Sequence, residues 1–111
     1  PARRAARGLI VFLNSGAGLR VKSGMGVYAA SKFALTALAD AIRADEAGLV
    51  RVTSLHPGRT ATDMQAELRV SEGGEFRPEE YLDPRDVART VRLAVDLPPN
   101  TTLESLRIAP I

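Results

Sequence analysis

A serine, a tyrosine and a lysine occur at a spacing that suits proton transfer to an oxygen atom. Tyr28 and Lys32 are four residues apart, so a helix would place both side chains on one face, and Ser15 lies thirteen residues upstream of Tyr28. The chain has only two lysines and two tyrosines, so a chance match at this spacing is rare. A free phenol has a pKa of about 10, and a nearby ammonium group favours its phenolate form. These residues therefore predict acid–base chemistry near neutral pH, with the serine hydroxyl hydrogen-bonded to the reacting oxygen.

A strand, a loop and a long helix would position these three residues. Residues 9–13 form a continuous apolar run, which predicts a strand buried on both faces of a parallel sheet. Residues 14–26 are rich in Gly and predict a loop with backbone freedom. Residues 27–47 lack Pro and Gly and predict a helix that Gly48 ends. The apolar positions of this helix recur at helical spacing, at Phe33, Ala34, Ala37, Leu38, Ala41 and Ile42.

The rest of the chain predicts two more strands and a second long helix. Residues 49–55 form a strand that Pro57 and Gly58 break, and residues 60–81 are irregular with one short helix over 63–68. Asp83 is a helix N-cap followed by Pro84 at the first helical position. That helix runs to about residue 97, and 103–109 is a third strand. The inward-facing residues of the helix are predicted to be Val87, Val91, Leu93, Ala94 and Leu97. This alternation of strands and helices implies a parallel sheet with crossover helices.

Three motifs in this order resemble the short-chain dehydrogenase/reductases, which are nicotinamide-dependent oxidoreductases. They are Asn14-Ser15-Gly16-Ala17-Gly18, Tyr28-Ala29-Ala30-Ser31-Lys32 and Pro57-Gly58-Arg59-Thr60-Ala61-Thr62. The resemblance implies an α/β fold, namely the C-terminal half of a Rossmann-type doubly wound parallel sheet with about three strands. Residues 1–111 would then form one partial domain. Its parts would be an active-site segment over 9–64, a substrate lid over 63–82, and a final helix and strand over 83–109.

The resemblance also implies roles for the residues of the first two motifs. Tyr28 would be the general acid and base that exchanges a proton with the substrate oxygen. Lys32 would bind the nicotinamide ribose and favour the phenolate form of Tyr28. Ser15 would hydrogen-bond the substrate carbonyl or alkoxide, with Gly16 and Ala17 beside it in the substrate site. The substrate would be a small carbonyl compound or alcohol.

The third motif would hold the cofactor. In the family, the segment that corresponds to Pro57, Gly58, Thr60 and Thr62 contacts the nicotinamide carboxamide. Thr60 stands where the family usually has an aliphatic residue, a mild change if only its backbone touches the cofactor. Thr62 also suits the N-cap of the helix over 63–68. The hydride would come from NAD or NADP, because no side chain can donate one.

The chain departs from the family in several respects, and the missing phosphate-binding turn leaves alternatives open. It contains no Gly-x-x-x-Gly-x-Gly turn for the cofactor phosphates. We therefore expect residues 1–111 alone to show little turnover and the strand over 9–13 to have an open edge. A non-catalytic remnant or scaffold domain is an alternative, and an extended-branch enzyme such as a sugar-nucleotide epimerase is another. The Pro-Gly-x-x-x-Thr run favours the simpler reductases.

Composition excludes several other classes of protein. There is no Cys and a single His, which excludes disulfides and gives no metal-ligand spacing. The net charge is only +2 without a long basic cluster, which argues against nucleic-acid binding. The apolar run over 9–13 is too short for a membrane span or a signal peptide. We interpret residues 1–7 as the end of a helix that Gly8 stops, and a cytoplasmic location is the default.

Three further expectations concern single residues and assembly. Asn14 and His56 are predicted to be structural and not catalytic. Small residues lie along the helix over 27–47, at Ala30, Ala34, Ala37 and Ala41. They suit either an ordinary core or the subunit interface that this helix forms in the family. We expect a homo-oligomer built through this helix.

Overall fold

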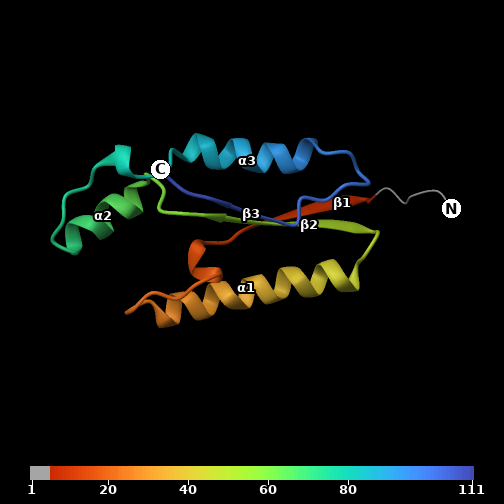
Figure 1. The fold of residues 1–111 in the computed structure, drawn as a ribbon, viewed down its shortest axis with the longest axis horizontal. Helices are drawn as coiled ribbons and strands as arrows, with labels where there is room; N and C mark the ends of the chain where they lie inside the picture. The colour runs from red at the N-terminus through yellow and green to blue at the C-terminus, as the bar shows by residue number, and fades with distance from the viewer. Residues whose placement is uncertain (1–5) are drawn as a thin grey trace.

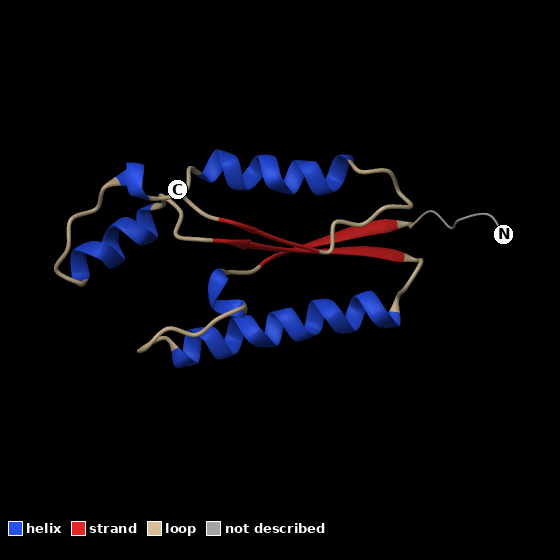
Figure 2. Ribbon diagram, viewed as in Figure 1, coloured by secondary structure: helices blue, strands red, loops and turns tan. Residues whose placement is uncertain are grey.

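A three-stranded parallel sheet lies between two long helices. The computed structural model describes residues 6–111, and its strands are β1 (Gly8–Leu13), β2 (Val50–Pro57) and β3 (Ser105–Ile108), in the spatial order β1-β2-β3. Helix α1 (Gly26–Asp45) covers one face and α3 (Pro84–Asp96) covers the other (Figures 1 and 2). The predicted α/β architecture with crossover helices is confirmed.

Shorter helices lie at the end of the sheet where the strands terminate. They are the 3-10 helix η1 (Gly16–Gly18), α2 (Asp63–Ser71) and the 3-10 helix η2 (Pro78–Glu80). Helix α2 is longer than the helix predicted over 63–68. Figure 1 shows α2 beyond the ends of the strands, at the same end of the molecule as the start of α1.

Helix boundaries follow the local signals in the sequence. Thr62 caps α2 by accepting a hydrogen bond from the backbone N–H of Gln65. Asp83 caps α3 by accepting one from the backbone N–H of Arg85. After α1 ends, Gly48 adopts a φ of 82°, a left-handed conformation that only Gly adopts without strain. All three boundary signals were predicted from the sequence.

The core lies around the central strand β2. Val52 and Leu55 of β2 are fully buried, and Ala29 of α1 and Ala94 of α3 are buried with them. The prediction that the first strand is buried on both faces is wrong, since 56% of Leu13 is exposed. Strand β1 has a paired strand on one side only among residues 6–111, so its open edge follows the prediction.

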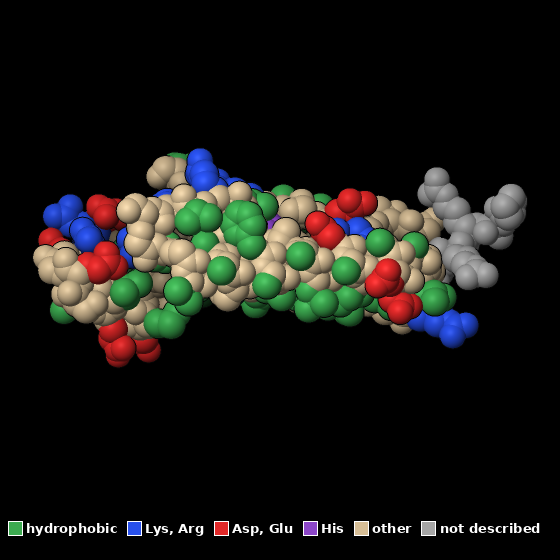
Figure 3. All heavy atoms as spheres, turned by 90° about the horizontal axis from the view of Figure 1, so that it is seen from below, with side chains coloured by type: hydrophobic (Ala, Val, Ile, Leu, Met, Phe, Trp, Pro, Cys, Tyr) green, Lys and Arg blue, Asp and Glu red, His purple; other side chains and the backbone are tan. Residues whose placement is uncertain are grey.

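The apolar stripe of α1 faces outward. The helix buries Ala29 and Ala39, whereas Phe33 and Leu38 are 42% and 50% exposed. Six exposed apolar residues in the middle of α1 form what we call the α1 face: Ala30, Phe33, Ala34, Ala37, Leu38 and Ala41. Figure 3 views the molecule from the α1 side and shows apolar side chains along this helix. The interpretation of these alanines as ordinary core is therefore wrong for the described residues.

Helix α3 follows its predicted pattern with one exception. Ala94 is buried, and Val87, Val91 and Leu97 are half-buried. Leu93 is 54% exposed and does not face inward. Its neighbour Ala94 takes the inward position, and consecutive helical residues differ by about 100° in direction.

The segment before β1 is only partly described. Residues 1–5 lie outside the described part of the chain, and with them most of the helix end predicted over 1–7. Ala6 and Arg7 are not helical. The backbone N–H of Arg7 donates to the carbonyl of Leu49, 2.7 Å away, and leads the chain into β1.

The N-cap of α3 predicts a measurable pH effect. The guanidinium and the backbone N–H of Arg85 both donate to Asp83, and they lower the carboxyl pKa from 3.8 to about 2. A carboxylate with a lowered pKa stabilises the fold above the unfolded pKa, and this contribution is lost as pH falls through the folded pKa. We expect the difference in Tm between wild type and Asp83→Asn to shrink on acidification from about pH 4 to about pH 2.

The matched control is Asp96→Asn at the opposite end of α3, where the carboxylate pairs with Arg92 and caps no helix N-terminus. Melting curves of the natural protein and both variants across this pH range would check the prediction. A Tm difference for Asp83→Asn that is independent of pH would contradict it.

Candidate active site

Each predicted motif lies at the edge of the sheet where the strands end. Ser15 follows β1, Pro57 is the last residue of β2, and Tyr28 and Lys32 lie in the first two turns of α1. Helix α1 runs antiparallel to the strands, so its N-terminus lies at the same edge (Figure 1). Ligands of open parallel sheets bind outside the carboxyl ends of the strands. The fold therefore brings the predicted site residues to the position where such a site is expected.

Ser15 is the N-cap residue of the short helix η1, and hydrogen bonds to its side chain and its carbonyl hold it in place. Its Oγ accepts a hydrogen bond from the backbone N–H of Ala17 at 3.2 Å. Its carbonyl oxygen lies 2.9 Å from Nδ1 of His56, whose side chain is only 1% exposed. The histidine thus joins the end of β2 to the start of the loop, which is the structural role predicted for it.

A buried amide ties the serine loop to α1. Asn14 Nδ2 donates to Thr36 Oγ1 at 2.9 Å and to the carbonyl of Lys32 at 3.3 Å. Its Oδ1 accepts from the backbone N–H of Ser15 at 2.8 Å. Asn14 is buried, so these bonds satisfy polar groups that water cannot reach. Asn14 therefore fixes Ser15 relative to the helix turn that carries Lys32.

Thr36 completes this contact and was not identified from the sequence. Its Oγ1 lies 3.1 Å from the carbonyl oxygens of both Gly18 and Lys32, and one hydroxyl proton can serve either acceptor. A threonine one turn after Lys32 carries no sequence signal of its own. Only the fold shows that it faces the end of β1.

Tyr28 and Lys32 lie together on α1. Lys32 Nζ is 5.7 Å from the centroid of the Tyr28 ring. Tyr28 is 45% exposed, and Lys32 is half-buried. Within residues 6–111, no hydrogen bond joins the side chains of Ser15, Tyr28 and Lys32 directly. Their common position at one edge of the sheet depends on the packing of η1 against α1 and on the Asn14 contacts.

The segment predicted to hold the cofactor forms local hydrogen bonds. The backbone N–H of Gly58 donates to the carbonyl of Ile108 at 2.8 Å. Thr60 Oγ1 donates to the carbonyl of Gly58 at 3.1 Å, and Thr62 Oγ1 accepts from Gln65. The two threonine side chains are thus engaged locally, as proposed for Thr62, and the backbone after β2 lies at the carboxyl edge.

Aromatic and ionic contacts fold the segment over residues 63–82 back toward the end of β2. The Arg59 guanidinium lies 5.6 Å from the centroid of the Tyr81 ring and pairs with Glu72 at 3.2 Å. Tyr81 packs on Phe76 with a centroid separation of 5.0 Å. Leu82 exchanges backbone hydrogen bonds with Arg59 and Ala61, at 2.9 and 2.8 Å. The predicted irregular segment therefore returns to the strand end from which it started.

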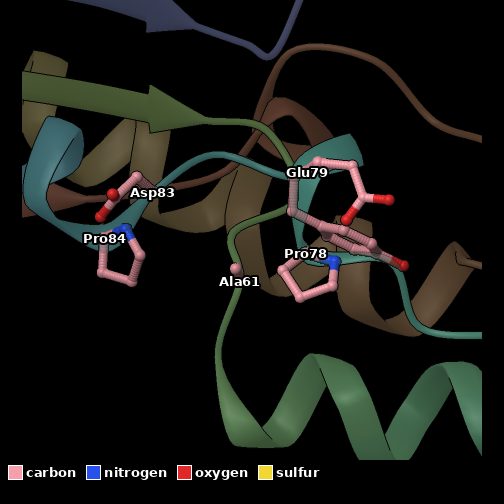
Figure 4. Close-up of a pocket in the computed structure, with 6 residues that line it drawn as sticks. Ala61, Pro78, Glu79, Asp83 and Pro84 are labelled. Atoms are coloured by element: carbon pink, nitrogen blue, oxygen red, sulfur yellow. The ribbon is translucent and has the colours of Figure 1, made fainter.

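An open depression of about 410 Å³ lies beside this segment, and Figure 4 shows the residues around it. The residues that line it are Ala61, Pro78, Glu79, Tyr81, Asp83 and Pro84. It shares no residue with the Ser15, Tyr28 and Lys32 group. We place the candidate chemistry at that group and not in the depression, because neither carboxylate of the depression is enclosed.

The residues at the edge suit the nicotinamide end of a dinucleotide. Within residues 6–111, Lys32 forms no ion pair. A Cβ atom added to Gly58 would make only ordinary contacts, the nearest with Pro110 at 3.5 Å and Ala109 at 3.6 Å. Ammonium and backbone groups are the donors that a ribose and a carboxamide require. Over the same residues, no cluster of three or more His, Cys, Asp or Glu side chains could hold a metal ion. No helix there has both the length and the apolarity for a membrane crossing.

Comparison with known proteins identifies the family. The family model described as short chain dehydrogenase matches residues 2–73, which include Ser15, Tyr28, Lys32 and Thr62. The chain belongs to the short-chain dehydrogenase family. A glycine betaine reductase of Emericella nidulans is 38% identical over 109 residues, which cover 94% of this chain and 9% of that protein.

Other relatives of this chain include dehydrogenases and a reductase. The 2,3-dihydro-2,3-dihydroxybenzoate dehydrogenase of Escherichia coli is 36% identical over 120 residues, covering 94% of this chain and 48% of that protein. A solved betaketoacyl-[ACP] reductase of Bacteroides thetaiotaomicron is 32% identical with a TM-score of 0.68, over 90% of this chain and 39% of that one. The solved serine dehydrogenase from Escherichia coli is 26% identical with a TM-score of 0.72, over 92% of this chain and 39% of that one. The chain spans less than half the length of each of these relatives.

The close contact between Gly18 and Asn14 predicts a sensitive position. A methyl group on Gly18 would overlap the Asn14 side chain, at 2.9 Å from Cγ. We expect Gly18→Ala to lower the free energy of unfolding by about 1–3 kcal/mol and to reduce activity by displacing Ser15. Urea denaturation and an activity assay of the natural protein would measure both effects.

The control is Gly26→Ala at the start of α1, where an added methyl group meets nothing within 4 Å. It should leave both quantities close to wild type. Equal stability and activity in the two variants would show that the Asn14 contact does not constrain the loop.

Proposed function

We propose that the natural protein interconverts a carbonyl group and a secondary alcohol by hydride transfer, as an NAD(P)-dependent oxidoreductase. The observation that carries the proposal is the pairing of Tyr28 with Lys32 on α1, 5.7 Å from ammonium to ring centroid, beside the loop of Ser15. Asn14 supports it by joining that loop to the α1 turn of Lys32.

Each of these residues has a distinct chemical role in the proposal. The Tyr28 hydroxyl gives a proton to the substrate oxygen during reduction and takes it back during oxidation. The Ser15 hydroxyl donates a hydrogen bond to the same oxygen, where negative charge develops. The Lys32 ammonium favours the phenolate that remains when Tyr28 has lost its proton. Gly16 and Ala17 border the substrate beside Ser15.

The same edge would bind the nicotinamide end of NAD or NADP, which when bound supplies or accepts the hydride. Lys32 would contact the ribose hydroxyls. The backbone of Pro57, Gly58, Thr60 and Thr62 would hold the carboxamide, since both threonine hydroxyls already form local bonds. The role of these residues toward the cofactor would be to bind and orient the nicotinamide ring.

Removal of one oxygen atom tests the proposed role of Tyr28. We expect Tyr28→Phe to lower kcat by about 100-fold or more, the typical contribution of a positioned acid or base, while cofactor affinity stays near wild type. Consumption of NADH and NADPH by the natural protein with a panel of carbonyl compounds would measure this. Tyr81→Phe is the matched control, because that ring packs on Phe76 in the lid. Full activity of Tyr28→Phe would rule out the assigned mechanism.

We also propose that the α1 face binds the same face of a second copy of the protein. A continuous apolar surface of this kind commonly marks a protein interface. The small residues Ala30, Ala34, Ala37 and Ala41 would allow two helices to approach closely. The active-site residues Tyr28 and Lys32 lie on the same helix, so assembly would also fix the position of the site.

A charge placed on this face should disrupt the assembly. We expect Leu38→Glu, at a position that is 50% exposed, to shift the natural protein toward the monomer, because association would bury the new carboxylate. Leu93→Glu on α3, at a position that is 54% exposed, is the matched control and should not change the mass. Sedimentation velocity measures both. An equal sedimentation coefficient for the two variants and wild type would contradict this interface.

A further inference from the structure

Arg107 brings a guanidinium group to the serine loop from the far end of the chain. Arg107 lies on β3 in register with His56 on β2. Residues in register on neighbouring strands point to the same face of the sheet. His56 reaches the carbonyl of Ser15 at 2.9 Å. A methyl group on Gly16 would lie 3.9 Å from Nε and 4.0 Å from Nη2 of Arg107. The guanidinium therefore lies against the residue that follows Ser15.

This cation has no acidic partner within residues 6–111. Seven arginines form ion pairs there, and Arg107 is not among them: they are Arg43, Arg59, Arg69, Arg77, Arg85, Arg89 and Arg92. Arg107 is exposed, and its guanidinium donates no hydrogen bond to another described residue. Glu104 is the nearest acid along the chain, and within residues 6–111 it forms no ion pair with Arg107.

The loop beside Arg107 contributes positive charge only. Residues 6–39 contain no Asp or Glu, and their cations include Arg20, Lys22 and Lys32. A cleft bordered by one sign of charge attracts ligands of the opposite sign. A guanidinium binds carboxylate and phosphate oxygens through two parallel hydrogen bonds, which fixes the orientation of the bound group.

We propose that Arg107 binds an oxyanion of the substrate and makes anionic carbonyl compounds the preferred substrates of this oxidoreductase. The inference rests on the proposed function, because it gives the substrate a second attachment point next to Ser15. Ser15 and Tyr28 hold the reacting oxygen, and Arg107 holds a carboxylate or phosphate on the other side of Gly16. A methyl group on Gly16 would make only ordinary van der Waals contact with the guanidinium, at 3.9 and 4.0 Å, so the two groups are direct neighbours. Arg107 determines specificity and does not take part in proton transfer.

Matched substrate pairs that differ in charge test the proposal. The natural protein with saturating cofactor would be assayed with pyruvate, acetoacetate and levulinate, each beside its methyl ester. Dihydroxyacetone phosphate beside dihydroxyacetone forms a separate arm, which distinguishes a phosphate from a carboxylate. The variants are Arg107→Gln and Arg107→Lys. The control is Arg92→Gln on α3, whose guanidinium pairs with Asp96 at 3.0 Å.

We expect wild type to prefer at least one anion over its neutral partner by about tenfold or more in kcat/KM, as a charge-assisted hydrogen bond provides. Arg107→Gln should lose this preference through a higher KM for the anion, with kcat and the KM of the neutral compound nearly unchanged. Arg107→Lys should keep part of the preference, because it keeps the charge but not the planar fork. Arg92→Gln should behave as wild type. Equal preference for anion and neutral compound in wild type, or a preference that survives in Arg107→Gln, would overturn the proposal.

A binding measurement separates this inference from the proposed reaction. Saturation-transfer NMR would record binding of the same pairs without any turnover. If no carbonyl compound is reduced but an anion binds in a way that Arg107→Gln abolishes, the oxyanion site stands and the proposed reaction fails. If anion and neutral compound bind alike, or if Arg107→Gln changes neither, the oxyanion site is refuted, whether or not reduction is observed.

Discussion

The site depends on one buried amide. Asn14 satisfies its side chain with the backbone of Ser15, the carbonyl of Lys32 and the hydroxyl of Thr36. An unpaired buried amide costs about 1–3 kcal/mol, so the loop has little freedom to leave α1 while Asn14 stays buried. The bonds of Asn14 thereby fix the end of β1 to the turn of α1 that carries Lys32, 18 residues away in sequence. Without this contact, only the Thr36 hydroxyl at the carbonyl of Gly18 and the packing of η1 on α1 would align the two elements that carry the serine and the tyrosine.

The sheet that carries this contact has open surfaces. Strand β1 pairs only with β2 among residues 6–111, and Leu13 at its end is exposed. The chain spans less than half the length of relatives such as the dihydroxybenzoate dehydrogenase, and a dinucleotide fold of this type needs two halves with the cofactor across their junction. The position of Ser15 at the end of the open strand is consistent with that arrangement. In the proposed reaction, the residues described here would provide proton transfer and the nicotinamide contacts, and residues 6–111 include no Gly-x-x-x-Gly-x-Gly turn for the phosphates.

Element boundaries could be predicted from the sequence because their signals are local. Asp83 and Pro84 mark the start of α3 to the residue, and the Pro57 break falls at the end of β2. The orientation of α1 could not be predicted in this way, because periodicity defines an apolar face but not what covers it, and here Phe33 is exposed while Ala29 is buried. The Asn14 network and the approach of Arg107 to the loop also escaped prediction. Both join residues far apart in sequence. The packing of α1 on the end of β1 brings the partners of Asn14 together, and the register of β2 and β3 brings Arg107 to the loop.

The central claim is that one substrate oxygen is shared by the hydroxyls of Tyr28 and Ser15. A crystal structure of the natural protein with its nicotinamide cofactor and an unreactive substrate analogue tests this most directly. The account predicts that the analogue's oxygen lies within about 2.6–3.2 Å of both Tyr28 Oη and Ser15 Oγ. An analogue bound in the depression lined by Pro78, Tyr81 and Pro84, with neither hydroxyl in contact, would contradict it.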